Sequence, residues 1–309
     1  MVADSSIPCP SVVCFGMITP ARVLVVDRLP DWNTGTILRD GAEFISDDAA
    51  IVAGLLAAWG ESTELVGTAL GDDEAGRRTV RRLREMGIGG NFELRKDIET
   101  PFEINVSDSL GGRTYIWDRR PEVLATLDDA DLSAIEGAKL LYVDWYDAPH
   151  IVHAMRAAKE ACVPVMLNLE HGHSQAEALS KLVPHATICQ AVTDAAQLET
   201  DAESVARLLL DGGVETALVT LASGGVVGIR GEEALHVAAP ELQPADTCGA
   251  GATFSAAYIV GLLAGTDFEA SLRFAVAAAS LKCTIVGLRA FPYDHIRELA
   301  SGLEARWLS

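Results

Sequence analysis

A glycine-rich segment in the last third of the chain carries the clearest chemical signal. Residues 246–254 read Asp-Thr-Cys-Gly-Ala-Gly-Ala-Thr-Phe, and an apolar helical pattern follows directly. The first backbone N–H groups of a helix have no partner within the helix, so such a turn can bind an anion. Gly249 and Gly251 lack side chains that would block an approaching phosphoryl group. On spacing alone, a simple tight turn before a core helix remains an equal alternative.

Two pairs of charged residues could contact a small-molecule substrate. Asp47 and Asp48 stand at the start of a predicted helix, where capping and the helix dipole alone favour acids. Arg119 and Arg120 follow a predicted strand and could pair with an anionic substrate group, although exposed arginines are commonly just solvated. For each pair, both the substrate contact and the purely structural explanation stay open.

Polar residues at the ends of two predicted strands are further candidates. Residues 145–147, Trp-Tyr-Asp, end a strand at the edge where open α/β sheets bind ligands. A substrate contact by Asp147 and simple packing are equal alternatives there. Residues 170–173, Glu-His-Gly-His, include metal-ligand types, but no third ligand follows at a recognisable spacing. The sequence therefore favours a role without metal for residues 170–173.

The elements that must position these residues alternate between strand and helix. Strands are predicted at residues 11–16, 23–30, 65–71, 139–144, 163–169, 186–189, 216–221 and 226–230. Helices are predicted at residues 48–59, 73–86, 149–161, 174–181, 194–198, 201–212, 251–264, 268–282 and 293–305. This βαβ series predicts an α/β fold with a doubly wound, mostly parallel sheet and helices on both faces.

The stretch between about residues 91 and 120 has a different pattern. Residues 92–95, 102–106 and 113–117 alternate apolar and polar side chains. Strands of period two with one solvated face predict a small antiparallel sheet, distinct from the parallel core, which residues 22–44 could join. We expect an α/β domain of residues 1–16, 46–90 and 121–309 and a β-sheet lid of residues 17–45 and 91–120.

Composition and charge restrict the class of partner. The chain has 309 residues, of which 49% are hydrophobic, enough for a large core. Its formal net charge of -20 repels nucleic acid and acidic membrane surfaces, so we expect neither as a partner. The six cysteines are scattered without a C-x-x-C pair, which favours free thiols in a reducing cytosol. Because no signal peptide or long apolar run is evident, a cytoplasmic protein is expected.

The segment at residues 246–254 resembles the signature of the PfkB, or ribokinase-like, family of carbohydrate kinases. The family pattern is Asp-Thr-x-Gly-Ala-Gly-Asp-Thr-Phe, and Ala252 is the one departure from it. Weaker matches follow the family's order at residues 71–76, 100–101, 112–114, 219–225 and 282–292. The resemblance implies ATP- and Mg²⁺-dependent phosphorylation of a sugar or sugar-like alcohol, and a lid that often pairs two subunits into a homodimer.

The resemblance also implies roles for individual positions. The anion hole for the transferring phosphoryl group would be formed by Gly249, Ala250 and Gly251. Position 252 would hold the general base. Asp246 would lie near a monovalent cation, K⁺ in members that use one, and Asp194 near Mg²⁺ and the phosphates. The nucleotide would be bordered by Thr220, Ala222, Gly225, Val276 and Lys282.

Several positions depart from the family pattern. Ala252 cannot accept a proton, and loss of a general base costs about 10²–10⁴-fold in rate. Ala21 stands where many members have an Asp that binds substrate hydroxyls, and Ile51 replaces an Asn. Ser46 and Asp47 replace a Gly-Gly pair that lets the substrate approach the backbone. The positions expected at the substrate are Ala21, Asp47, Asp48, Arg119 and Asp147.

Two explanations of these departures stay open. In one, Ala252 was introduced to inactivate a kinase, which the otherwise intact motif favours. In the other, the protein is a natural pseudokinase that binds nucleotide or sugar without catalysis, which the losses at Ala21, Ser46 and Asp47 favour. A third reading, some other Rossmann-like enzyme, is weakened because no G-x-G-x-x-G follows the first strand.

Overall fold

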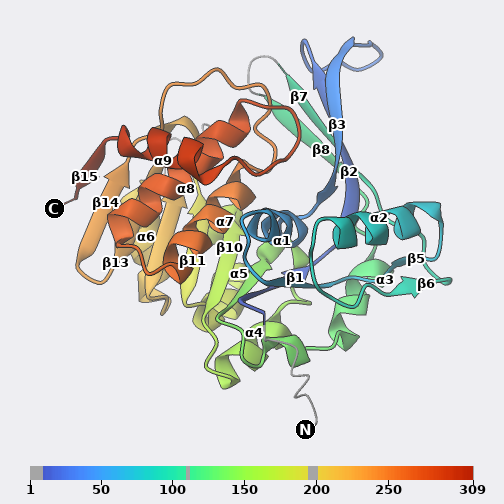
Figure 1. Ribbon diagram of the computed structural model, residues 1–309, viewed down its shortest axis with the longest axis horizontal. Helices are drawn as coiled ribbons and strands as arrows, with labels where there is room; N and C mark the ends of the chain where they lie inside the picture. Colours follow the sequence, from blue (N-terminus) through green and yellow to red (C-terminus); the bar gives the residue numbers. More distant parts are fainter. Residues whose placement is uncertain (1–9, 109–111, 194–200, 309) are drawn as a thin grey trace, which may run out of the picture.

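A nine-stranded sheet forms the centre of the molecule (Figure 1). The computed structural model describes residues 10–108, 112–193 and 201–308. From edge to edge the strands are β15 (Ala305–Trp307), β14 (Glu233–Val237), β13 (Val226–Arg230), β12 (Thr216–Thr220), β11 (Ile188–Val192), β10 (Val165–Glu170), β9 (Leu140–Asp144), β1 (Val12–Gly16) and β4 (Thr63–Gly67). The strands from β12 to β4 run parallel, whereas β13, β14 and β15 pair antiparallel.

The central strands are apolar on both faces. Every residue of β1 and of β9 is buried, as expected for strands that helices cover on both sides. Within β1, Val12 and Cys14 point into one hydrophobic core, while Val13 and Phe15 point into the other. The predicted doubly wound, mostly parallel sheet is therefore confirmed.

Helices cover the two faces of this sheet (Figure 1). One core contains α1 (Asp48–Ala58), α7 (Ala250–Leu263), α8 (Phe268–Cys283) and α9 (Tyr293–Ser301). The other contains α4 (Val152–Glu160), α5 (Ala176–Leu182) and α6 (Ala202–Asp211). After α1, Gly60 takes a φ of 88°, a conformation that glycine adopts without strain, and this ends the helix as the sequence predicts.

A second, four-stranded sheet projects from the main body as a lid (Figure 1). Its order is β3 (Leu38–Ser46), β2 (Thr19–Val26), β7 (Glu103–Asp108) and β8 (Arg113–Trp117). The expected small sheet is confirmed, but it is not wholly antiparallel, because β2 and β7 run parallel. Between β3 and β7 the chain passes through α1, β4 and α2 (Glu74–Glu85) in the main body. Because of this crossover, the chain re-enters the lid at β7 in the same direction as β2.

Residues 92–95 do not join the lid, contrary to the prediction. Their strand, β6 (Leu94–Arg95), pairs in parallel with β5 (Leu70–Gly71) in a separate two-stranded sheet. Backbone hydrogen bonds from Leu70 to Glu93 and from Asp72 to Arg95 fix this pairing. The short period-two pattern indicates a strand but does not identify its neighbour.

Three further elements differ from the sequence prediction. The predicted helix at 293–305 ends at Ser301, and the chain then forms β15, which pairs with β14. Neither β14 nor the short helix α3 (Pro121–Leu124) was predicted. The helix predicted at 194–198 lies outside the described residues. Within the described part of the chain, none of the helices has the length and apolar character needed to cross a membrane.

Candidate active site

The glycine turn lies at the N-terminus of α7, as predicted. Gly249 precedes the helix with φ 76° and ψ 10°, and a Cβ there would lie 2.8 Å from Leu288 Cδ2. Glycine therefore meets both the backbone and the steric requirement. Among the described residues no side chain caps the helix, and its Ala250 N–H makes only a long bond, 3.3 Å, to the Thr247 carbonyl oxygen. Ala252, in the first turn, is only 1% exposed.

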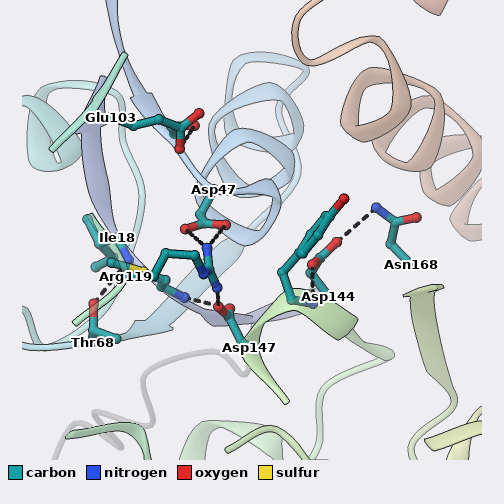
Figure 2. Close-up of polar contacts among 11 residues, drawn as sticks. Ile18, Asp47, Thr68, Glu103, Arg119, Asp144, Asp147 and Asn168 are labelled. Carbon is teal, nitrogen blue, oxygen red and sulfur yellow. Dashed lines mark hydrogen bonds and ion pairs between the residues drawn. The ribbon is translucent and has the colours of Figure 1, made fainter. Parts of the chain in front are cut away.

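Strand ends place a polar cluster beside this turn. The Asn168 amide nitrogen donates to Asp48 at 2.7 Å, to Asp144 at 2.9 Å and to Glu170 at 3.1 Å. Figure 2 shows Asn168 directed toward the Asp144 carboxylate. Glu170 Oε1 lies 3.2 Å from the place that a Cβ on Gly251 would occupy. Three carboxylates thus surround one amide next to the predicted anion hole.

Two carboxyl groups of this cluster, those of Asp48 and Asp144, resist ionisation. Burial, together with the negative charges of Glu170 and Asp47, raises the pKa of Asp48 to about 8. Burial and the Asp48 charge likewise raise the pKa of Asp144 well above its usual range. Like charges in a low-dielectric site cannot all ionise without a compensating cation. The cluster therefore has the electrostatic character of a site that favours bound positive charge.

Arg119 joins two of the predicted substrate residues (Figure 2). Its guanidinium donates to the Asp47 carboxylate at 2.8 and 3.0 Å and also to the Asp147 carboxylate. Asp147 in turn accepts a hydrogen bond from the Met17 backbone at 2.8 Å. Burial and the Asp47 charge raise the pKa of Asp147 to about 7, although Arg119 opposes this shift. Asp47 makes no capping bond to α1, so helix capping does not explain its presence.

Two positions that lack the family's glycine keep a glycine-like backbone. Asp47, at a position where the resemblance expects Gly, has φ 66° and ψ 143°. Ala222, which stands where the resemblance implies the first Gly of the nucleotide loop, has φ 50°. Residues with a Cβ seldom adopt such angles, and each instance costs about 1–3 kcal/mol. At these two positions the backbone therefore keeps a positive φ, as a glycine would allow, although the residue is not glycine.

The lid contributes polar side chains to the same region. Glu103, Asn105 and Ser107 alternate along β7 and are all buried. Ser46 donates to Glu103 at 3.2 Å, and burial with the charge of Asp47 raises the pKa of Glu103 to about 7. Both polar atoms of the Asn105 amide are buried, and no hydrogen-bond partner for them lies among the described residues. Such unsatisfied atoms are rare in proteins and favour a ligand or a water at this place.

Asp246 anchors the segment that leads into the glycine turn. Its carboxylate accepts hydrogen bonds from Ser107 of the lid at 2.9 Å and from the Cys248 backbone at 2.9 Å. The Lys282 ammonium lies 2.7 Å from the Asp246 carbonyl oxygen and 3.0 Å from its carboxylate. This ammonium is buried against Asp246, so it is not available to a nucleotide. If Lys282 contacts a nucleotide, it does so through its backbone.

The other predicted site residues are only partly brought together. Gly225 has φ 92°, and a Cβ there would lie 2.0 Å from the Val237 carbonyl oxygen. A hollow of about 610 Å³ between α8, α9 and Pro240 has none of the predicted nucleotide residues in its lining. Ala21 is buried in β2. The described residues contain no group of three or more acidic, His or Cys side chains arranged for a metal, and Asp194 lies outside them.

Sequence reasoning missed several residues of this site. Asn168 lies within β10 and Gln190 within β11, both buried strands of the parallel sheet, and Gln190 donates to the Gly251 carbonyl oxygen at 3.3 Å. Glu103 lies on the buried face of a lid strand. A polar residue inside an otherwise apolar strand is the signal that would have identified the first two, because a buried polar side chain needs a partner.

The fold and the site together define a ribokinase-like α/β protein, in which a sheet lid rises from the end of β1 beside a glycine turn. A model of the pfkB family carbohydrate kinase matches residues 48–295. The chain belongs to this family of carbohydrate kinases.

Individual relatives agree with this assignment. The chain is 28% identical over 299 residues to the ribokinase of Arabidopsis thaliana, covering 90% of this chain and 77% of that protein. It is 26% identical over 242 residues to the adenosine kinase of Saccharomyces cerevisiae, covering 71% of each. The structure of Arabidopsis thaliana ribokinase complexed with ribose and ATP superposes with a TM-score of 0.71 at 23% identity, covering 94% of this chain and 99% of that one.

Proposed function

We propose that the chain binds ATP with Mg²⁺ and transfers a phosphoryl group to a hydroxyl of a sugar-like alcohol, slowly because of Ala252. The observation that carries this proposal is the N-terminus of α7, which no side chain caps among the described residues. Gly249 and Gly251 there have no side chain that would block a phosphoryl group, and position 252 lies in the first turn of the helix. Backbone N–H groups of residues 249–251 would bind the transferring group, and the helix dipole would stabilise its charge. An alanine at position 252 leaves the acceptor hydroxyl without a base there.

Mg²⁺ would neutralise charge on the phosphates, which supply much of its coordination in kinases. Glu170 is the protein ligand that we propose for it, because this carboxylate lies against Gly251 of the anion hole. The raised pKa of Asp48 next to Glu170 supports the same view, since these carboxyl groups favour a nearby cation. Asp194 remains a second candidate.

The acceptor should carry no negative charge. Six carboxylates lie in the region between the turn and the lid: Asp47, Asp48, Glu103, Asp144, Asp147 and Glu170. Arg119, the predicted anion-binding residue, is already paired with two of them. A phosphate or carboxylate on the acceptor would compete with these pairs and add negative charge beside acids that already resist ionisation. A neutral or amine-bearing polyol fits the charge distribution better.

The test is to restore the missing base. We would prepare Ala252→Asp and Ala252→Asn and follow ATP consumption with a panel of sugars, amino sugars, polyols and nucleosides. A gain of about 10²–10⁴-fold with one acceptor, seen with Asp and not with the isosteric Asn, is the expected result. If neither variant gains activity while ATP or a sugar still binds by calorimetry, the pseudokinase alternative replaces this proposal.

We also propose that the protein is a cytoplasmic homodimer that pairs through its lids. Large apolar side chains are exposed on or next to the lid strands: Leu38 is 53% exposed, Phe102 53%, Ile116 57% and Trp117 45%. Exposed apolar side chains that gather on one small sheet are typical of a protein interface. The net charge of -20 supports the expectation that neither nucleic acid nor acidic membrane is a partner.

A further inference from the structure

Lys282, in the last turn of α8, is a fully buried lysine that contacts Asp246 at the start of the glycine-turn segment. The side chains of Lys282 and Asp246 have no exposed surface. The ammonium donates to the Asp246 carbonyl oxygen at 2.7 Å and lies 3.0 Å from Asp246 Oδ2. Charged groups are rarely buried so completely unless each compensates the other. The two residues therefore form one unit in which a single positive charge offsets a single negative charge.

The oxygens that hold this ammonium are those that a metal cation would need. The resemblance to the family implies a monovalent cation beside Asp246, and K⁺ binds carboxylate and carbonyl oxygens. Here one carboxylate oxygen and the carbonyl oxygen of Asp246 both face Lys282 Nζ. A free cation at the same oxygens would stand against the ammonium, where like charges repel. The residues present do not fit K⁺ at Asp246.

The same carboxylate connects three parts of the site. Asp246 Oδ1 accepts from Ser107 of β7 and from the Cys248 backbone, each at 2.9 Å. Asp246 Oδ2 accepts from the Gly287 backbone, after α8, at 3.1 Å. Asp246 thus links the lid, the glycine turn and the loop after α8. Lys282, which pairs with Asp246, supports all three.

We propose that Lys282 is a built-in monovalent cation, which takes the place of K⁺ at Asp246 and makes the folding and nucleotide binding of this protein independent of alkali cations. The expectation that nucleotide binding is independent of alkali cations rests on the proposed function. The expectation that folding is independent of them does not. Lys282 acts by holding the segment from Asp246 to the glycine turn, so it is a positioning residue and not a catalytic one.

The experiment compares thermal unfolding in potassium, sodium and choline chloride at equal ionic strength. We expect the parent protein to unfold at the same temperature in all three salts. Lys282→Ala should lower the midpoint in choline chloride by about 5–10 °C, because it leaves a buried carboxylate without its partner. K⁺ should then restore part of the loss, because the shortened side chain leaves room for an ion that binds only the folded state.

Matched variants distinguish this result from general destabilisation. Lys181→Ala removes an exposed lysine and should change neither the midpoint nor its salt dependence. Lys282→Met with Asp246→Asn removes both charges and fills the space, so K⁺ should not raise its midpoint. Lys282→Arg keeps the charge and should remain indifferent to K⁺ if it folds.

Two outcomes would overturn the proposal. One is a parent protein whose midpoint rises specifically in K⁺, and the other is a destabilised Lys282→Ala that gains nothing from K⁺ over choline. If Lys282→Ala does not fold, the unfolding midpoints of the parent protein and of the double variant in the three salts test the proposal without it. ATP affinity measured by calorimetry in the same salts should be equal for the parent protein. Failure to bind ATP in every salt would reject the proposed function and leave the stability result standing.

Discussion

At the scale of single residues, buried carboxyl groups near Asn168 and Arg119 determine how the site responds to pH. Asp48 carries a pKa of about 8 because it is buried beside Glu170 and Asp47. Glu103 and Asp147, each with a pKa of about 7, lie in the same region between body and lid. Without a bound cation, these groups hold protons near neutral pH that an unfolded chain would release.

The free protein should consequently become less stable as the pH rises from about 4 to about 8. A carboxyl group whose pKa is higher in the folded state binds more protons there, so the free energy of unfolding falls through this window. Asp48→Asn should make the decline shallower by up to about 1.4 kcal/mol per pH unit. Urea unfolding at pH 5, 6, 7 and 8 measures this slope. Asp294→Asn, at a highly exposed carboxylate, should leave the slope unchanged, and an equal slope in Asp48→Asn would contradict the prediction.

Arg119 should be far more important for stability than its neighbour Arg120. Arg119→Met leaves Asp47 and Asp147 buried without their cation, which should lower the free energy of unfolding by about 3–5 kcal/mol at pH 8. The loss should be smaller at pH 5, where both carboxyl groups can take up protons. Arg120→Met breaks more exposed pairs with Asp118 and Glu99 and should cost about 0–1 kcal/mol. Similar losses for both variants in chemical unfolding would argue against the buried network.

Sequence reasoning reached some of these residues and not others. The turn at 249–251 was predicted correctly as the start of a helix because the glycines and the apolar run are neighbours in the chain. The network of Arg119 was not predicted, because its two partners lie 72 and 28 residues away. Only the folded topology brings these residues together. The sequence presented Arg119 as a candidate for binding an anionic substrate, whereas the structure pairs it with two carboxylates.

At the scale of elements, the loop after β12 combines a required glycine with a strained alanine. Ala222→Gly should raise the free energy of unfolding by about 0.5–1 kcal/mol, because glycine takes its φ of 50° without strain. Gly225→Ala should lower it by about 1–3 kcal/mol, because a Cβ there would overlap the Val237 carbonyl oxygen. Urea titration of both variants provides the comparison. If Ala222→Gly is destabilising, the alanine is not strained.

Elements with local signals were predicted well, and those defined by distant partners were not. Helix α1 follows from an apolar, Ala-rich run that ends at Gly60, and α2 from a charged amphipathic pattern that ends at Gly87; both glycines have positive φ. The parallel pairing of β2 with β7 depends on a crossover through the main body, so the local alternation could not reveal it. The pairing of β5 with β6 and that of β14 with β15 were missed for the same reason.

At the scale of the whole molecule, the lids should join two copies of the chain. The parent protein is expected to sediment as a dimer, and Ile116→Lys should shift it towards the monomer because it places a charge among the exposed apolar side chains of the lid. Leu208→Lys, on α6 in the main body, should leave the dimer intact. Analytical ultracentrifugation at several concentrations measures both. A parent protein that remains monomeric at high concentration would exclude this interface.

The three-residue strand β15 also affects how the protein behaves in solution. It covers β14 along one side of the nine-stranded sheet, through the pairs of Leu235 with Trp307 and of Val237 with Ala305. An uncovered strand edge offers unpaired backbone groups that can capture a strand of another molecule, which is a common route to aggregation. A very short outer strand gives an incoming chain little to pair with. Fusions or deletions that displace residues 305–307 would therefore lower the solubility of the protein more than they disturb the structure of the distant glycine turn.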